Sequence, residues 1–162
     1  MLVFPLKKIT APRRLKYELG PKWTRSSDSL YFPVISARIM KGDGTYSEKL
    51  LSFILDSGAM MSVLSKKLAE HLNLETFGKC EISGAVLKKE CRIPAKLSKI
   101  KMKLVDERGK LSPELNLTAA VPEIDEVPSV ISLNDLMGRF EISMNSREKK
   151  INFILFEENS TS

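Results

Sequence analysis

The chain has 162 residues, of which 43% are hydrophobic, and its formal net charge is +6. That hydrophobic content excludes wholesale disorder, and the length fits one domain with a sizeable core. No apolar run approaches the roughly 20 residues that a helix needs to cross a bilayer. The apolar start precedes the first lysines, which is the reverse of a secretory signal, so we expect a cytoplasmic protein without a membrane partner.

The 26 lysine and arginine residues are spread along the chain. In the densest series Lys99, Lys101 and Lys103 alternate with apolar residues, which is the period of a strand with one charged, solvated face. A nucleic-acid-binding β-barrel would interleave aromatic side chains with such lysines, and this stretch has none. The pattern therefore favours a solvated face over a nucleic-acid site.

The first 29 residues differ from the rest. They hold three prolines and a series of basic residues, and they end in the polar run Ser26-Ser27-Asp28. We interpret residues 1–29 as a basic N-terminal arm or extension, 30–156 as the folded domain and 157–162 as a C-terminal tail.

From residue 31 onward, short apolar segments alternate with turn residues, which predicts strand after strand. The expected strands cover residues 31–39, 47–55, 80–83, 89–97, 100–104, 116–121, 130–131 and 151–156. Helical spacing appears twice, at 65–72 with Ser65 as the N-cap and at 136–140 with Gly138 near its end. The fold class predicted is all-β, a barrel or sandwich with one or two short helices.

The segment Phe53-Ile54-Leu55-Asp56-Ser57-Gly58-Ala59 holds the candidate site. A carboxylate at the end of a buried strand costs desolvation energy, so it needs hydrogen-bond donors or a functional reason. Gly58 permits a tight loop in which backbone N–H groups approach Asp56, Ser57 offers a hydroxyl, and Ala59 leaves room for a neighbour. The residues alone leave two interpretations open, a catalytic loop or an Asx-type turn in which Asp56 bonds its own downstream N–H groups.

Residues 53–74 as a whole resemble the catalytic-loop segment of retropepsin-like aspartic proteases, and more closely the cellular retroviral-like domains than the viral enzymes. The matching positions are Asp56, Ser57, Gly58, Ala59, Ser62, Val63 and Leu64. The family's second signature is similar to residues 130–136, with Ser132 at the place of its glycine. A register one residue later aligns Asp135 instead and puts Leu133 at the glycine.

The resemblance implies a retropepsin-like closed β-barrel and an aspartic endopeptidase without cofactor or metal. Aspartic proteolysis needs two carboxylates that share one proton and hold a water. The chain offers one Asp-Ser-Gly, so the second Asp56 must come from a second copy in a homodimer. Met60 stands where viral members carry an acidic residue paired with an arginine, so we expect the dimer to be held differently.

The resemblance also implies a β-hairpin flap over a peptide substrate, with Ser83, Gly84 and Ala85 near its tip. Cys80 and Cys91 are symmetric about a turn between residues 85 and 86, and we interpret them as free thiols. Two other functions stay open: the same fold as a catalytically inactive dimerisation or interaction module, and a basic nucleic-acid-binding β-barrel, which the missing aromatic residues disfavour.

Overall fold

The computed structural model describes residues 1–10, 29–83 and 92–156. These residues form nine strands and two short helices, which confirms the all-β class. The elements are β1 (Leu2–Thr10), β2 (Ser29–Ile39), β3 (Leu51–Asp56), α2 (Lys66–His71), β4 (Phe77–Ile82), β5 (Ile93–Val105), β6 (Leu115–Pro122), β7 (Val130–Ser132), α3 (Leu133–Met137), β8 (Phe140–Asn145) and β9 (Lys150–Leu155). Neither helix is long and apolar enough to cross a membrane.

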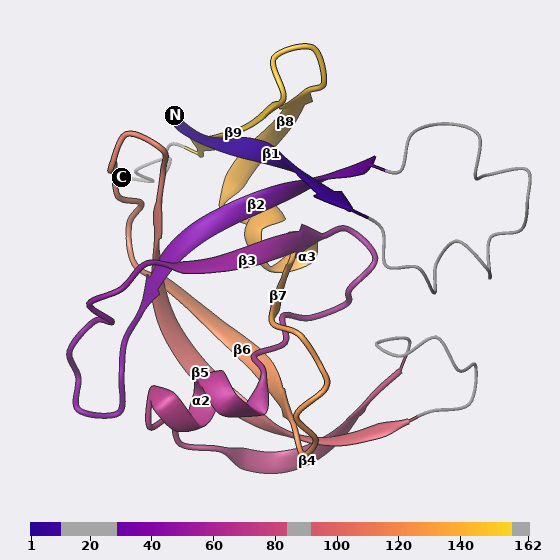
Figure 1. The fold of residues 1–162 in the computed structure, drawn as a ribbon. Coiled ribbons are helices and arrows are strands. Elements are labelled where there is room, and N and C mark those ends of the chain that lie inside the picture. The colour runs from indigo at the N-terminus through magenta and orange to yellow at the C-terminus, as the bar shows by residue number, and fades with distance from the viewer. Residues whose placement is uncertain (11–28, 84–91, 157–162) are drawn as a thin grey trace, which may run out of the picture.

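One branched sheet of nine strands curls around the core (Figure 1). Its main path runs β4-β5-β2-β1-β9-β8, while β3, β6 and β7 pair off this path. Strand β2 pairs with β1 along its first half and with β3 and β5 along its second half. This exchange of partners folds the sheet over. The segment around Val63 bonds Ala120 of β6 on one side and Val130 of β7 on the other, so backbone hydrogen bonds close a ring through β2, β5, β6, β7 and β3.

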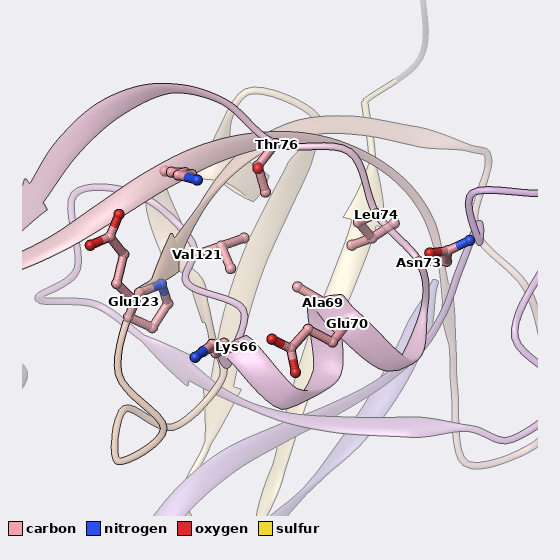
Figure 2. A pocket seen from close by; sticks show the side chains of 10 residues that line it. Lys66, Ala69, Glu70, Asn73, Leu74, Thr76, Val121 and Glu123 are labelled. Atoms are coloured by element: carbon pink, nitrogen blue, oxygen red, sulfur yellow. The ribbon is translucent and has the colours of Figure 1, made fainter.

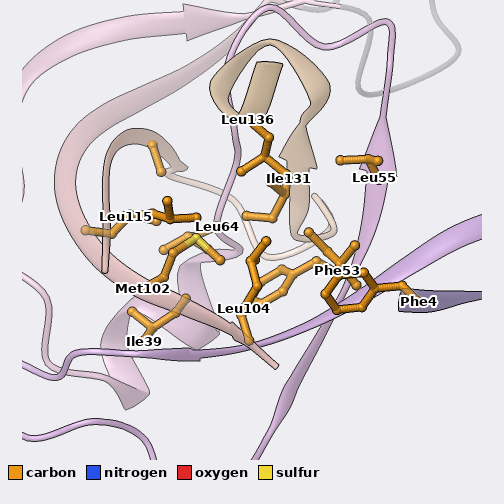
Figure 3. Close-up of a cluster of buried hydrophobic side chains, with 14 of the residues drawn as sticks. Phe4, Ile39, Phe53, Leu55, Leu64, Met102, Leu104, Leu115, Ile131 and Leu136 are labelled. Carbon is orange, nitrogen blue, oxygen red and sulfur yellow. The ribbon is translucent and has the colours of Figure 1, made fainter. Parts of the chain in front are cut away.

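The core lies inside this curled sheet (Figure 3), and it is built from the alternate residues of the strands. Phe153 of β9 lies edge-on to Phe4 of β1, with ring centroids 5.2 Å apart, and to Phe140 of β8, at 5.7 Å. Burial of each such ring contributes about 2–3 kcal/mol, and edge-to-face geometry is preferred between aromatic rings. The three rings therefore join the two ends of the chain to one core.

Strand β5 buries opposite faces along its length. From Ser98 to Leu104 its even-numbered residues are buried, and Lys99 and Lys101 are exposed, as the alternating pattern predicts. Before that point the odd-numbered residues Ile93 and Ala95 are buried, in a second and smaller hydrophobic cluster. The later part of β5 thus contributes one face to the main core, and its first residues contribute the opposite face to the smaller cluster.

The boundary expected at residue 30 does not hold for the start of the chain. Residues 2–10 form β1, which pairs with β9 from Leu2 to Pro5 and with β2 from Leu6 to Thr10. The alternation of Leu2, Phe4 and Leu6, all buried, is a strand signal that the proline and the lysines obscured. Each half of β1 is thus paired on one side only, and the paired side changes after Pro5. Proline has no backbone N–H to donate to a neighbouring strand, so it is tolerated at this change of partners.

Three other elements differ from expectation. Helix α3 begins at Leu133 rather than 136, because Ser132 serves as its N-cap. The two strands expected at 89–97 and 100–104 form one strand, β5, from Ile93; residues 89–91 lie outside the described residues. Strand β8 was not expected, and it pairs with β9 along its whole length. Because β1 lies on the other side of β9, β9 is an inner strand.

Candidate active site

Asp56 is the last residue of β3, which lies between β2 and β7. The pairing with β7 is parallel and places Asp56 opposite Ser132, the residue that caps α3. Phe53 and Leu55 anchor β3 in the core, at 1% and 6% exposure. The carboxylate therefore stands on a rigid strand end rather than on a free loop.

Asp56 uses little of its hydrogen-bonding capacity. Its Oδ1 accepts one hydrogen bond, from the backbone N–H of Gly58 at 2.7 Å, and the residue is half-buried. This is the Asx-type geometry that was one interpretation of the sequence. A carboxylate has about four acceptor sites, and no other hydrogen bond to Asp56 is found within the described residues. The local turn is thus present, and most of the carboxylate is free to bind something else.

The rest of the loop has two different environments. Ser57 and Gly58 are exposed beside the carboxylate, while Ala59 is half-buried. The carbonyl oxygen of Ala59 accepts hydrogen bonds from the Ser132 hydroxyl at 2.6 Å and from the Asn134 amide at 3.4 Å. The predicted loop residues are therefore together, and their far end is fixed to the start of α3.

A buried network supports this loop from behind. The N–H and the hydroxyl of Ser62 both donate to Oδ2 of Asp135, at 2.8 and 2.5 Å. The N–H of Ser132 donates to the Ser62 hydroxyl at 3.0 Å, and both serines are 0% exposed. Buried polar groups that are all bonded in this way rigidify their surroundings. Asp135 therefore acts as a positioning residue for the loop. The sequence pointed to Asp135 only through one of the two possible alignments with the family's second signature.

The structure gives a role to the candidate residues of both registers. Asp135 accepts hydrogen bonds from Ser62. Ser132 has φ −69° and ψ 134°, and its hydroxyl accepts from the N–H of Asn134 at 3.2 Å. Leu133 does not adopt a positive φ either, so the backbone requires glycine at neither Ser132 nor Leu133.

The flap was expected between strands β4 and β5, which pair antiparallel. Ser83 follows β4 and is exposed; Gly84, Ala85 and Cys91 lie outside the described residues. The strand register places Cys80 opposite Ala95, so the expected symmetry of Cys80 with Cys91 about residues 85 and 86 is wrong. Cys80 is a free thiol, and its burial raises the pKa of that thiol.

The small hydrophobic cluster joins residues of the loop after β3, of β4, β5 and β6, and of the segment before β7. Its buried members are Val63, Ile93, Ala95, Ala120 and Val127, and Met61, Cys80, Ile82 and Val130 pack against it half-buried. Isolated bridges join Val63 to both Ala120 and Val130. Two of the half-buried members lie close to Asp56: Met61 is five residues further along the chain, and Val130 pairs with Ile54 of β3.

A surface pocket lies elsewhere, between α2 and the end of β6 (Figure 2). Its lining mixes Lys66 and Lys96 with Glu70 and Glu123 and includes no residue of 56–59. It does not bring a charged group to Asp56. Within residues 1–10, 29–83 and 92–156, no group of three or more His, Cys, Asp or Glu side chains is placed to hold a metal ion.

Two solved proteases are similar in fold. The EIAV protease, complexed with the inhibitor HBY-793, is 18% identical over 66% of this chain and 86% of its own, with a TM-score of 0.42. A retropepsin-like aspartic protease from Rickettsia conorii is 16% identical over 75% of this chain and 96% of its own, with a TM-score of 0.40. No family model and no curated protein matches the sequence.

The Rickettsia conorii protein is a retropepsin-like aspartic protease, which is the family that residues 53–74 resemble. Identities this low bear on the fold alone. The function proposed below therefore starts from the geometry around Asp56.

Proposed function

We propose that this chain is an aspartic endopeptidase whose active site forms between two copies, each contributing Asp56. The observation that supports it is a half-exposed carboxylate that accepts a single hydrogen bond, at the end of a buried strand and on a loop braced by Ser62 and Asp135. A carboxylate kept rigid and largely unbonded is what general acid-base chemistry needs. One copy supplies half of the required pair.

In the proposed mechanism the two Asp56 carboxyls share one proton and hold a water molecule between them. The ionised member takes a proton from the water as the water attacks the scissile carbonyl carbon. The neutral member donates its proton to the carbonyl oxygen, which becomes a hydroxyl of the tetrahedral intermediate. As that intermediate collapses, the Asp56 that took the water's proton donates it to the amide nitrogen, the other Asp56 accepts a proton from a hydroxyl of the intermediate, and the C–N bond breaks, which restores the shared proton of the pair.

The substrate would be an extended peptide lying between the Asp56 loop and the β4–β5 arms, where it can add as a further strand. The half-buried Met61, Ile82 and Val130 offer an apolar surface there. We therefore propose that the peptide presents apolar side chains beside the scissile bond, since apolar surface removed from water contributes about 25 cal/mol per Å².

A cleavage assay tests this function. Purified protein is incubated with an unfolded protein between about pH 4 and pH 7, the range over which a carboxyl pair that shares a proton operates. Specific activity should rise with protein concentration, because dilution separates the two halves of the site. Full specific activity in a preparation that sedimentation shows to be monomeric would exclude the shared site.

The same assay separates the alternatives. Stable dimers that cleave no substrate would favour an inactive interaction module. Salt-sensitive retention of a labelled oligonucleotide without proteolysis would favour the nucleic-acid-binding barrel.

A further inference from the structure

The outer face of strand β5 carries a row of lysine side chains. Lys99, Lys101 and Lys103 alternate with buried residues of the main core, so the three side chains leave the same face of the sheet. Neighbours in the row are about 6.6–6.8 Å apart along the strand. Arg38 of β2 lies opposite Lys103 and extends the row across the sheet. Two paired strands therefore present four basic residues on one face.

Glu114 is the carboxylate that meets this row in the described part of the chain, and it is already engaged. One of its carboxylate oxygens lies 3.7 Å from Nζ of Lys101, and the other accepts the hydroxyl proton of Tyr46. A single acid of this kind balances one of the four positive charges.

The other three cations of the face keep their charge. The Arg38 guanidinium donates to the carbonyl oxygens of Ser47 and Glu48, both at 2.8 Å, which fixes its position without neutralising it. Among the described residues, no carboxylate lies within ion-pair distance of Lys99, Lys103 or Arg38. The face is therefore suited to a partner that carries a series of negative charges.

Aromatic rings lie beside two of the lysines. Nζ of Lys99 is 6.0 Å from the ring centroid of Phe77, and Nζ of Lys103 is 4.9 Å from that of Tyr46. Strand β5 itself holds no aromatic residue, so its sequence indicated a solvated face alone. The rings come from β4 and from the segment after β2. Tertiary structure thus brings together the lysines and aromatic rings that typify surfaces for single-stranded nucleic acids.

Phe77 reaches this face through an irregularity in β4. The register of β4 on β5 shifts after Phe77, which lies opposite Leu97, whereas uninterrupted pairing would place it opposite the buried Ser98. Gly78 in the shifted stretch has φ +57°, a conformation that glycine adopts easily. Bulges of this kind re-aim a side chain. The Phe77 side chain is accordingly 45% exposed and offers a ring on which a base can stack.

We propose that this face of β4, β5 and β2, which are neighbours in the sheet (Figure 1), binds single-stranded nucleic acid. Phosphates contact Lys99, Lys103 and Arg38, and a base stacks on Phe77. Every base has a π-face for an aromatic ring, whereas an acidic polypeptide has no base to stack there. None of these residues belongs to the Asp56 loop, so the binding is additional to the proposed proteolysis.

Salt dependence is the first measurement. The purified chain is titrated into a fluorescently labelled oligothymidylate of about 15 nucleotides, and anisotropy is followed from about 0.05 M to about 0.2 M salt. Each phosphate neutralised on a single strand contributes about −0.7 to the slope of log K against log salt concentration, so three contacts give about −2. A slope near zero, or no binding at the lowest salt, would overturn the proposal.

Neutral substitutions locate the surface. Lys99→Gln and Lys103→Gln should each raise the dissociation constant about threefold or more at low salt and make the slope shallower by about 0.7. The control Lys67→Gln, at an exposed position of α2, should stay within about twofold of wild type. Glu114→Gln keeps an acceptor for the Tyr46 hydroxyl and removes a negative charge, so it should bind more tightly. Wild-type affinity in both β5 variants would overturn the inference.

Phe77→Leu separates nucleic acid from an acidic polypeptide. Leucine keeps an apolar side chain but offers no ring. The dissociation constant for oligothymidylate should rise at least about fivefold, while that for poly-glutamate stays within about twofold of wild type. Unchanged oligonucleotide affinity in Phe77→Leu, or equally tight binding of poly-glutamate by wild type, would assign the face to acidic polypeptides and overturn the inference.

These outcomes are separable from the cleavage assay. Lys99 and Lys103 lie on β5, outside both the Asp56 loop and the small hydrophobic cluster. Their glutamine variants should therefore lose affinity for the oligonucleotide and keep wild-type cleavage of an unfolded protein. Binding through this face by a chain that cleaves nothing would keep the inference and exclude proteolysis, and proteolysis without oligonucleotide binding would do the reverse.

Discussion

Asp56 and Asp106 occupy similar local settings and differ in how far their carboxylates are bonded. Asp56 is the last residue of β3, Asp106 is the first residue after β5, and each is followed within three residues by a glycine. Asp56 accepts one hydrogen bond, from Gly58. Asp106 accepts from the backbone N–H groups of Arg108 and Lys110, at 2.9 and 2.8 Å, and from the Arg108 guanidinium at 3.3 Å.

The two loops also differ in burial. Asp106 is 5% exposed; burial alone would raise the pKa of this carboxyl, but the N–H groups of Lys110 and Arg108 and the guanidinium together lower it. The adjacent Glu107 donates its N–H to the carbonyl of Val3 and pairs with Lys150, which ties the turn to β1 and β9. A fully bonded carboxylate stabilises the fold, whereas a braced but unbonded one is available for chemistry.

The largest expected effect comes from Asp56→Asn. The amide oxygen still accepts from Gly58, so the fold should survive, but the variant cannot share a proton in the carboxyl pair. We expect cleavage to fall by about 10⁴-fold or more and the melting temperature to stay close to wild type. The assay compares it with Asp125→Asn, an exposed acid, which should keep wild-type activity. Substantial activity in Asp56→Asn would refute the assignment of the site.

The opposite outcome is expected for Asp106→Ala. It leaves two backbone N–H groups and an arginine without their acceptor, which costs about 2–3 kcal/mol. Denaturant unfolding should show this loss, while the activity of the protein that remains folded and dimeric stays unchanged. Asp43→Ala, which removes an exposed turn carboxylate bonded to Thr45, is the control and should change stability little. Loss of activity beyond loss of folding would place Asp106 in the site.

The contribution of the Asp106 carboxylate to the free energy of unfolding depends on pH, and the direction of its pKa shift gives the sign. The folded pKa of Asp106 lies below its unfolded value of about 3.9. Its charge therefore stabilises the fold above that value, and the contribution is lost as pH falls through the folded pKa. The difference in unfolding free energy between wild type and Asp106→Asn should be constant above about pH 5 and should shrink below about pH 4. A difference that grows on acidification would contradict this sign.

The smallest effect is expected for a third aspartate, Asp135. In Asp135→Asn the amide oxygen can accept from Ser62 as the carboxylate does, so the loss should stay below about 1 kcal/mol. Asp135→Leu removes the acceptor for the N–H and the hydroxyl proton of the buried Ser62. We expect it to lower both stability and kcat, because the loop that carries Asp56 loses its brace. Equal effects of the two substitutions would show that the hydrogen bonds to Ser62 do not matter.

Most strands and the first helix could be predicted from local patterns. Strands β2, β6 and β9 and helix α2 lie within two residues of where periodicity placed them, and the Ser65 cap is present, whereas β3 begins at Leu51 rather than at residue 47. Strands β1 and β8 were missed for different reasons. Proline and lysines hid the alternation in β1, and β8 is short and follows a helix signal, so its partner decides that it is a strand.

The sequence by itself determined the loop around Asp56, because the strand end, the carboxylate and Gly58 lie within a few residues and backbone geometry sets their contacts. The tertiary structure alone decided what braces that loop and which edge stays open. Ser62 and Asp135 are 73 residues apart, and only the parallel pairing of β3 with β7 brings them together. Likewise, β1 and β8 pair with opposite sides of β9, so that among the described residues β9 is an inner strand and β8 is an edge strand. Strand partners are chosen by packing summed over the whole core, which no local pattern contains.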